Sequence, residues 1–214
     1  MVEQADGPVI LVIKSSANGE RSVSNLLLDE AAVRLTASTP GARIIERDLD
    51  RDPVPHVRSE TLAGIGRAAP ATAGAEITRT LSDTLIAELK SASLVLIGAP
   101  MYNFGIPSTL KSWFDHVLRA GETFYYDAEG PHGLAGGRPV IVVETSSGVY
   151  SGGPMTAMDA QEPHLRSMLG FIGLDDVTFV RAEGLAFGEA AVAAAMDGAR
   201  AKLVAVAMPS PAMA

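Results

Sequence analysis

Short apolar runs recur along the chain, and each ends in a cluster of small or polar residues. The three strongest cover residues 9–13, 94–97 and 140–143. Continuous apolar runs of this length are typical of strands buried on both faces, as in a parallel sheet. Two weaker runs, at 42–46 and 177–180, complete a set of five predicted strands.

Apolar residues at helical spacing lie between these runs and predict helices there. A last helix is predicted from near Glu189 to Val206, and Pro107 and Pro163 suit first helical turns. Alternating strands and helices predict an α/β fold with an open, doubly wound parallel sheet and helices on both faces. The helical groups are Leu28, Ala31, Ala32 and Leu35; Ile77, Leu81, Leu85 and Leu89; Ile106, Leu110, Trp113, Phe114 and Val117; and Leu165, Met168, Leu169 and Ile172.

One segment differs in character. Residues 50–75 are rich in Pro, Gly and Ala and are too long for a plain connection, so a functional or disordered loop is expected. We find no internal repeat and no second domain. Residues 1–214 are therefore predicted to form a single domain, with a frayed tail at 208–214.

Composition narrows the class of protein. The 214 residues are 47% hydrophobic and 20% charged, which is ordinary for a globular fold, and the net charge of −8 argues against binding to duplex nucleic acid. The absence of cysteine excludes disulfides and a cysteine nucleophile. No stretch of about 20 apolar residues occurs, and no signal peptide is evident, so we expect a cytoplasmic protein without a membrane partner.

Ligands of open α/β sheets bind outside the carboxyl ends of the strands. Right-handed crossovers place those ends, and the loops after the three strong strands, along one edge of the sheet. The first loop, at 14–25, places Ser16, Ser22 and Ser24 near the start of a helix. Free backbone N–H groups and the helix dipole favour an anion there. A simple helix cap at Ser22 or Ser24 explains the same residues equally well.

The second and third loops allow two interpretations each. Tyr102 and Phe104 lie beside Gly105 and form either a platform for a flat ring or part of the buried core. The small residues of 144–153 allow close approach of a ligand, although such a loop by itself is more typical of a flexible surface segment. Together, an anion cradle, an aromatic platform and a close backbone wall suit a phosphorylated planar ring.

Two other patterns predict no site. The glycines at 64–66 resemble a dinucleotide-binding fingerprint, but they do not follow a strand. The histidines lack the spacing of metal ligands, so no metal site is expected. His116, beside Asp115, is expected on an ordinary helix face. The four histidines are His56, His116, His132 and His164.

Seven segments match one known family in order along nearly the whole chain. They read KSS at 14–16, SVSN at 22–25, LSDTLIAELK at 81–90, APMYNFGIPSTLKSWFD at 99–115, RAGETFYYDAEGPHGL at 119–134, LGFIG at 169–173 and AEGLAFG at 182–188. With these segments the chain resembles the FMN-dependent NADH-azoreductases, which are also quinone reductases of the flavodoxin-like superfamily. The resemblance implies a flavodoxin-like sheet of about five strands.

The resemblance also implies bound FMN, NADH or NADPH as co-substrate, and a homodimer with the active site at its interface. Asn103, Tyr126 and Phe171 match positions on the substrate side, although core packing explains Tyr126 and Phe171 nearly as well. The phosphate-binding positions match Ser16, Ser22, Val23 and Ser24; the segment along the isoalloxazine matches Pro100, Met101, Tyr102, Asn103 and Phe104; and the third flavin loop matches Thr145, Ser146, Ser147 and Gly148.

One departure concerns the third loop. Many relatives carry an Arg there, but this chain reads Thr145-Ser146-Ser147-Gly148, so the resemblance does not identify a cation partner for the pyrimidine side of the ring. We expect hydride to pass from NAD(P)H through the flavin to quinones and aromatic azo compounds by a ping-pong mechanism. No protein acid or base is assigned. The alternative is a flavodoxin-type electron carrier without small-molecule turnover. The long 50–75 loop and Tyr125-Tyr126 argue against a carrier, because they favour a substrate pocket with a roof.

Overall fold

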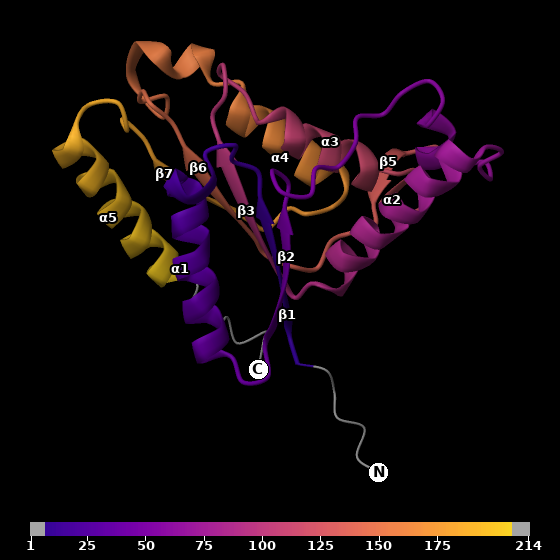
Figure 1. Cartoon of the computed structure of the whole chain (residues 1–214), viewed down its shortest axis with the longest axis horizontal. Coiled ribbons are helices and arrows are strands. Elements are labelled where there is room, and N and C mark those ends of the chain that lie inside the picture. The colour runs from indigo at the N-terminus through magenta and orange to yellow at the C-terminus, as the bar shows by residue number, and fades with distance from the viewer. Residues whose placement is uncertain (1–6, 207–214) are drawn as a thin grey trace.

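A five-stranded parallel sheet forms the centre of the fold. The computed structural model describes residues 7–206, and its sheet has the strand order β2-β1-β3-β6-β7 (Figure 1). In this doubly wound order, β2 lies on one side of β1, and the later strands β3, β6 and β7 are added on the other side. The prediction of a parallel sheet with about five strands is confirmed. The strands are β1 (Val9–Lys14), β2 (Arg43–Asp48), β3 (Leu94–Pro100), β6 (Val140–Thr145) and β7 (Val177–Ala182).

Helices cover both faces of this sheet. α1 and α5 lie on one face, and α2, α3 and α4 lie on the other, where Trp113 and Phe114 are fully buried (Figure 1). Every residue of β1, β3 and β6 is buried, because helices pack on both sides of these strands. The helices are α1 (Val23–Ser38), α2 (Ala73–Ser91), α3 (Ser108–Val117), α4 (Gln161–Phe171) and α5 (Glu189–Val206).

Two helical predictions need correction. Ile77 does not face the core but is 72% exposed, because the buried stripe of α2 runs instead through residues such as Thr78, Ser82, Leu85 and Leu89. Ile106 lies before α3 rather than in it, and Pro107 flanks the helix start instead of occupying its first turn. Pro163 lies within the first turn of α4, as predicted.

A β-hairpin was not predicted. β4 (Phe124–Asp127) and β5 (Gly130–Gly133) pair antiparallel beside α4. Gly130 has φ +121°, a backbone conformation that only glycine adopts readily, and the N–H of Glu129 donates to Asp127 Oδ1 at 2.9 Å. The hairpin places Tyr125 and Tyr126 at the surface.

The segment 50–75 is attached to the helices that it crosses. His116 Nε2 lies 3.0 Å from the carbonyl oxygen of Pro55, and His56 Nδ1 lies 2.8 Å from Ser112 Oγ. His116 is therefore not on an ordinary helix face but is 1% exposed, and burial lowers its pKa. Arg79 donates to carbonyl groups of the same segment, including that of Ala68 at 3.0 Å. The disordered alternative for this loop is thus wrong.

Two further expectations concern the chain as a whole. The predicted frayed tail at 208–214 lies outside the described residues. Within residues 7–206, no helix is both long and apolar enough to cross a bilayer.

Candidate functional site

Hydrogen bonds join the loops that follow β1, β3 and β6 at the carboxyl edge of the sheet. Ser15 Oγ donates to the carbonyl oxygen of Gly98 at 2.6 Å, which ties the first loop to β3. The N–H of Met101 donates to the carbonyl oxygen of Thr145 at 2.7 Å, which ties the second loop to the third. The three predicted loops thus form one continuous surface.

Buried hydroxyl groups surround the start of α1 in the first loop. Ser22 is the N-cap residue, and its Oγ accepts a hydrogen bond from the N–H of Asn25 at 3.2 Å and lies 3.0 Å from Ser24 Oγ. Ser16, Ser22 and Ser24 are each at most 2% exposed. The N–H groups of Val23 and Ser24 find no acceptor within residues 7–206. Ser22 therefore does cap the helix, as the simpler interpretation held. The cap still leaves two N–H groups at the start of α1 available to an anion.

The second loop contains an unusual turn. Asn103 and Phe104 have φ of +49° and +73°, and no other non-glycine residue described here has a positive φ. Backbone hydrogen bonds between Tyr102 and Gly105 close the turn in both directions, at 2.9 and 3.2 Å. Residues other than Gly, Asn and Asp rarely adopt this conformation, and such strain collects at functional sites.

The aromatic residues of this turn are not part of the core. Tyr102 is 37% and Phe104 is 40% exposed, so the core-packing interpretation is wrong for both. The hydroxyl of Tyr102 accepts a hydrogen bond from the N–H of Ala17 at 2.9 Å, which fixes the ring against the first loop. The two rings and the strained backbone form a platform at the edge of the sheet.

The third loop is hydrogen-bonded to the segment after β7. The N–H groups of Gly184, Leu185 and Ala186 donate to the carbonyl oxygens of Gly148, Ser146 and Ser147 at 2.9, 3.1 and 3.1 Å. These contacts use the carbonyl groups of the loop, whereas the N–H groups of Ser147 and Gly148 have no acceptor within residues 7–206. The loop is therefore tied to the edge of the sheet and presents backbone donors.

The structure does not bring Tyr126 and Phe171 to these loops. Both pack with Phe124, whose ring centroid is 5.7 Å from that of Tyr126 and 4.6 Å from that of Phe171. α4 begins at Gln161, whose side-chain amide donates to the carbonyl oxygen of Ala99 near the second loop. Phe171 is the last residue of this helix, about 15 Å farther along its axis. Core packing accounts for the half-buried Phe171, but Tyr126 is 57% exposed.

Sequence reasoning missed a buried carboxyl group beneath the site. Glu144, at the end of β6, is 5% exposed, and its Oε1 has no hydrogen-bond partner within the described residues. Arg181 Nε lies 3.3 Å from Glu144 Oε2, and the Arg181 guanidinium also contacts Glu162. Burial raises the pKa of Glu144 to about 7, although Arg181 opposes the rise. A lone acidic residue that ends a fully apolar run was the available signal.

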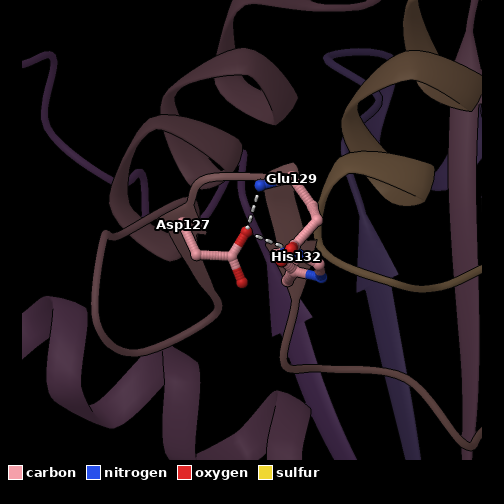
Figure 2. A group of neighbouring side chains, drawn as sticks. All are labelled: Asp127, Glu129 and His132. Carbon is pink, nitrogen blue, oxygen red and sulfur yellow. Dashed lines mark hydrogen bonds and ion pairs between the residues drawn. The ribbon is translucent and has the colours of Figure 1, made fainter.

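The hairpin also gathers groups that the sequence left apart. Figure 2 shows His132 beside Asp127 and Glu129. His132 Nε2 lies 2.7 Å from Asp127 Oδ1, and one ligand atom from each of the three residues falls within 4.8 Å of the others. The pairing across β4 and β5 produces this proximity, which histidine spacing along the chain does not reveal.

Comparison with known proteins agrees with this architecture. A family model described as flavodoxin-like fold matches residues 9–207. An FMN-dependent NADH:quinone oxidoreductase of Hyphomonas neptunium is 51% identical over 198 residues, which cover 92% of this chain and 95% of the relative.

Solved structures give the same result. An azoreductase from Bacillus anthracis str. Sterne superposes with a TM-score of 0.85 at 26% identity, over 94% of this chain and 98% of its own. An FMN-dependent NADH-azoreductase from Bacillus anthracis str. Ames Ancestor, solved in complex with FMN, superposes with a TM-score of 0.82 at 25% identity, over 94% and 99%. The chain therefore belongs to the flavodoxin-like family of FMN-dependent NADH:quinone oxidoreductases and azoreductases.

Proposed function

We propose that this protein is an FMN-dependent oxidoreductase that transfers hydride from NADH or NADPH to quinones and, more slowly, to aromatic azo compounds. The observation that carries the proposal is the continuous surface of three joined loops, which presents backbone donors on two sides of an aromatic, strained turn. The relatives named for FMN, NADH and quinone support the same chemistry.

The residues present fit FMN. A phosphate needs donors and little negative charge, and the start of α1 offers the N–H groups of Val23 and Ser24 among the hydroxyls of Ser16, Ser22 and Ser24. α1 packs closely on β3 here, since a Cβ added at Gly98 would lie 2.8 Å from Leu28 Cδ1 and would make that side chain shift. We therefore place the phosphate of FMN at the start of α1 in this proposal.

The second and third loops would hold the ring. When bound, the flavin accepts hydride from a nicotinamide and passes on reducing equivalents. Pro100, Met101, Tyr102, Asn103 and Phe104 would line one face, and Asn103 would also reach the substrate side.

The third loop, from Thr145 through Ser146 to Gly148, would approach the pyrimidine edge of the ring. The N–H groups of Ser147 and Gly148 are free to donate there and would stabilise negative charge without a titrating side chain. These backbone donors take the place of the Arg that many relatives carry.

The acceptor side requires a second copy of the chain. Tyr126 and Phe171 lie at the far end of α4 from the three loops of their own protomer, yet Tyr126 is largely exposed. We propose that a homodimer brings this aromatic group over the partner's flavin, with the segment 50–75 at the shared edge. Tyr126 and Phe171 then form a substrate-binding wall. We also place the protein in the cytoplasm, where disulfides are rare and a chain without cysteine fits.

Kinetics distinguish this enzyme from an electron carrier. Nicotinamide and acceptor would stack in turn on one exposed ring face, which gives ping-pong kinetics. Initial rates of NADH oxidation at several fixed menadione concentrations should give parallel double-reciprocal lines. Intersecting lines would show that both substrates bind together, and an absence of steady turnover would favour the electron carrier.

A further inference from the structure

The segment after the third loop is held by one carboxylate. Glu183, which follows β7, accepts hydrogen bonds from the N–H of Tyr150 at 2.7 Å and from the N–H of Ser151 at 2.9 Å, both at its Oε1. Its Oε2 accepts from the hydroxyl of Ser151. A single side chain thus fixes two consecutive residues of a segment that lies in no helix or strand.

Glu183 holds the backbone from which the ring of Tyr150 projects. That ring packs edge-on against Phe104, with 6.2 Å between the centroids, and so spans the second and third loops. It also lies directly against Gly148, where an added Cβ would come within 3.1 Å of the ring. A side chain at position 148 would make the Tyr150 ring shift slightly, so the glycine bears on the ring and the carboxylate on the backbone of the same residue.

Contacts along the whole segment 183–186 support this role. Glu183 fixes residues 150–151, while the N–H groups of Gly184, Leu185 and Ala186 fix residues 146–148. Hydrogen bonds to a carboxylate are stronger than neutral ones, so Glu183 makes the firmest of these contacts. Arg181 is engaged with Glu144 and Glu162, and no cation lies within salt-bridge distance of Glu183 in residues 7–206. The carboxylate is thus committed to the backbone of the loop.

We propose that Glu183 is a positioning residue that holds Tyr150 against Phe104 and thereby sets the width of the acceptor site. The proposal rests on the proposed function, because it assigns Tyr150 to the wall that an acceptor meets. It assigns no proton transfer to either residue. Loss of the carboxylate should let Tyr150 move away from Phe104. The kcat/KM for bulky acceptors should then rise relative to that for small ones.

The first test measures amide hydrogen exchange of the apoprotein, and it does not depend on activity. In Glu183→Ala, the amides of Tyr150 and Ser151 should exchange at least about tenfold faster, as expected for a lost charged hydrogen bond. Glu183→Gln keeps an acceptor oxygen and should show a smaller change. Glu189→Gln, an exposed nearby control, should match the wild type. Unchanged exchange in Glu183→Ala would overturn the positioning role.

The second test measures selectivity. The ratio of kcat/KM for an anthraquinone sulfonate to that for benzoquinone should rise severalfold in Glu183→Ala, mainly through KM, with unchanged FMN content. Tyr150→Ala should shift this ratio by the same factor. The double variant should shift it no further, because both changes remove the same wall of the site. Additive shifts, an unchanged ratio or a parallel loss of FMN would overturn the proposal. Loss of all quinone turnover in the wild type would instead refute the proposed function and leave the exchange result standing.

Discussion

The hydroxyl of Tyr102 accepts a hydrogen bond from the backbone N–H of Ala17 at 2.9 Å, across 85 positions of the chain. This contact joins the loop proposed to bind the phosphate to the loop proposed to bind the ring. Because Tyr102 also flanks the strained turn at Asn103 and Phe104, one side chain links the two halves of the proposed cofactor site.

Removal of that hydroxyl should weaken cofactor binding without unfolding the protein. We expect Tyr102→Phe to raise the Kd for FMN by about 3- to 10-fold, the equivalent of a net hydrogen bond worth about 0.5–1.5 kcal/mol. Titration of the apoprotein with FMN measures this effect. Thr84→Val is the control, because it removes an exposed hydroxyl whose hydrogen bond, at 2.9 Å, goes only to the Thr80 carbonyl within α2. An unchanged Kd for FMN in Tyr102→Phe would show that this hydrogen bond between the two loops does not contribute to cofactor binding.

Ser22→Asp should lose FMN while the protein stays folded. Aspartate caps a helix about as well as serine, but it cannot donate to a phosphate and it repels one. A like-charge pair at about 4 Å costs roughly 4 kcal/mol at an effective dielectric near 20, which corresponds to nearly three orders of magnitude in affinity. The flavin-to-protein ratio and circular dichroism of one sample measure both effects.

Thr72→Asp makes the same cap exchange at α2, where the Thr72 side chain accepts from the N–H of Ala75, and should keep its flavin. A fully loaded Ser22→Asp protein would remove Ser22 from the proposed phosphate site.

Glu144 makes stability depend on pH. Its pKa is about 7 in the folded protein against an ordinary value of 4.5, so the native state binds more protons between these values. The free energy of unfolding should therefore fall as the pH rises through this window. Glu144→Gln stays neutral and should exceed the wild type by roughly 1–3 kcal/mol at pH 8 and match it near pH 4. Urea unfolding across the pH range tests this, and a wild-type profile in the variant would contradict it.

A shared active site predicts complementation between two defective chains. Light scattering should give twice the chain mass of 22.2 kDa. Ser22→Asp alone should be inactive, and Tyr126→Ala should turn over quinone poorly. A mixed dimer should regain activity, since the intact hairpin of the first chain then covers the flavin of the second. An active monomer, or mixing without any gain, would place the whole site in one protomer.

The sequence predicted the parts of the fold that local pattern determines. β1, β3 and β6 were evident because helices bury both of their faces, whereas the exposed edge strand β2 gave a weaker signal. The hairpin β4–β5 escaped because its residues are mostly exposed, so no apolar run or alternation marks its strands. The charge environment of Glu144 escaped because its ion-pair partner, Arg181, lies on another strand, β7, and is itself shared with Glu162 of α4.

The three loops show the same division. Their positions followed from the strand order, and their serine, aromatic and glycine content indicated a ligand. The hydrogen bonds that hold them could not be predicted, because the third loop depends on donors from residues 184–186 and the second on the hydroxyl of Tyr102 reaching Ala17. Hydrogen bonds between distant segments leave no periodic signal in either segment.

The most direct test of the cofactor and its reaction is the visible absorption spectrum of the purified protein under anaerobic conditions. We predict a flavin spectrum that bleaches when NADH is added and returns when menadione follows, with FMN as the mass of the chromophore released by heat. A colourless protein that binds no added FMN, or a flavin that NADH leaves oxidised, would contradict the account.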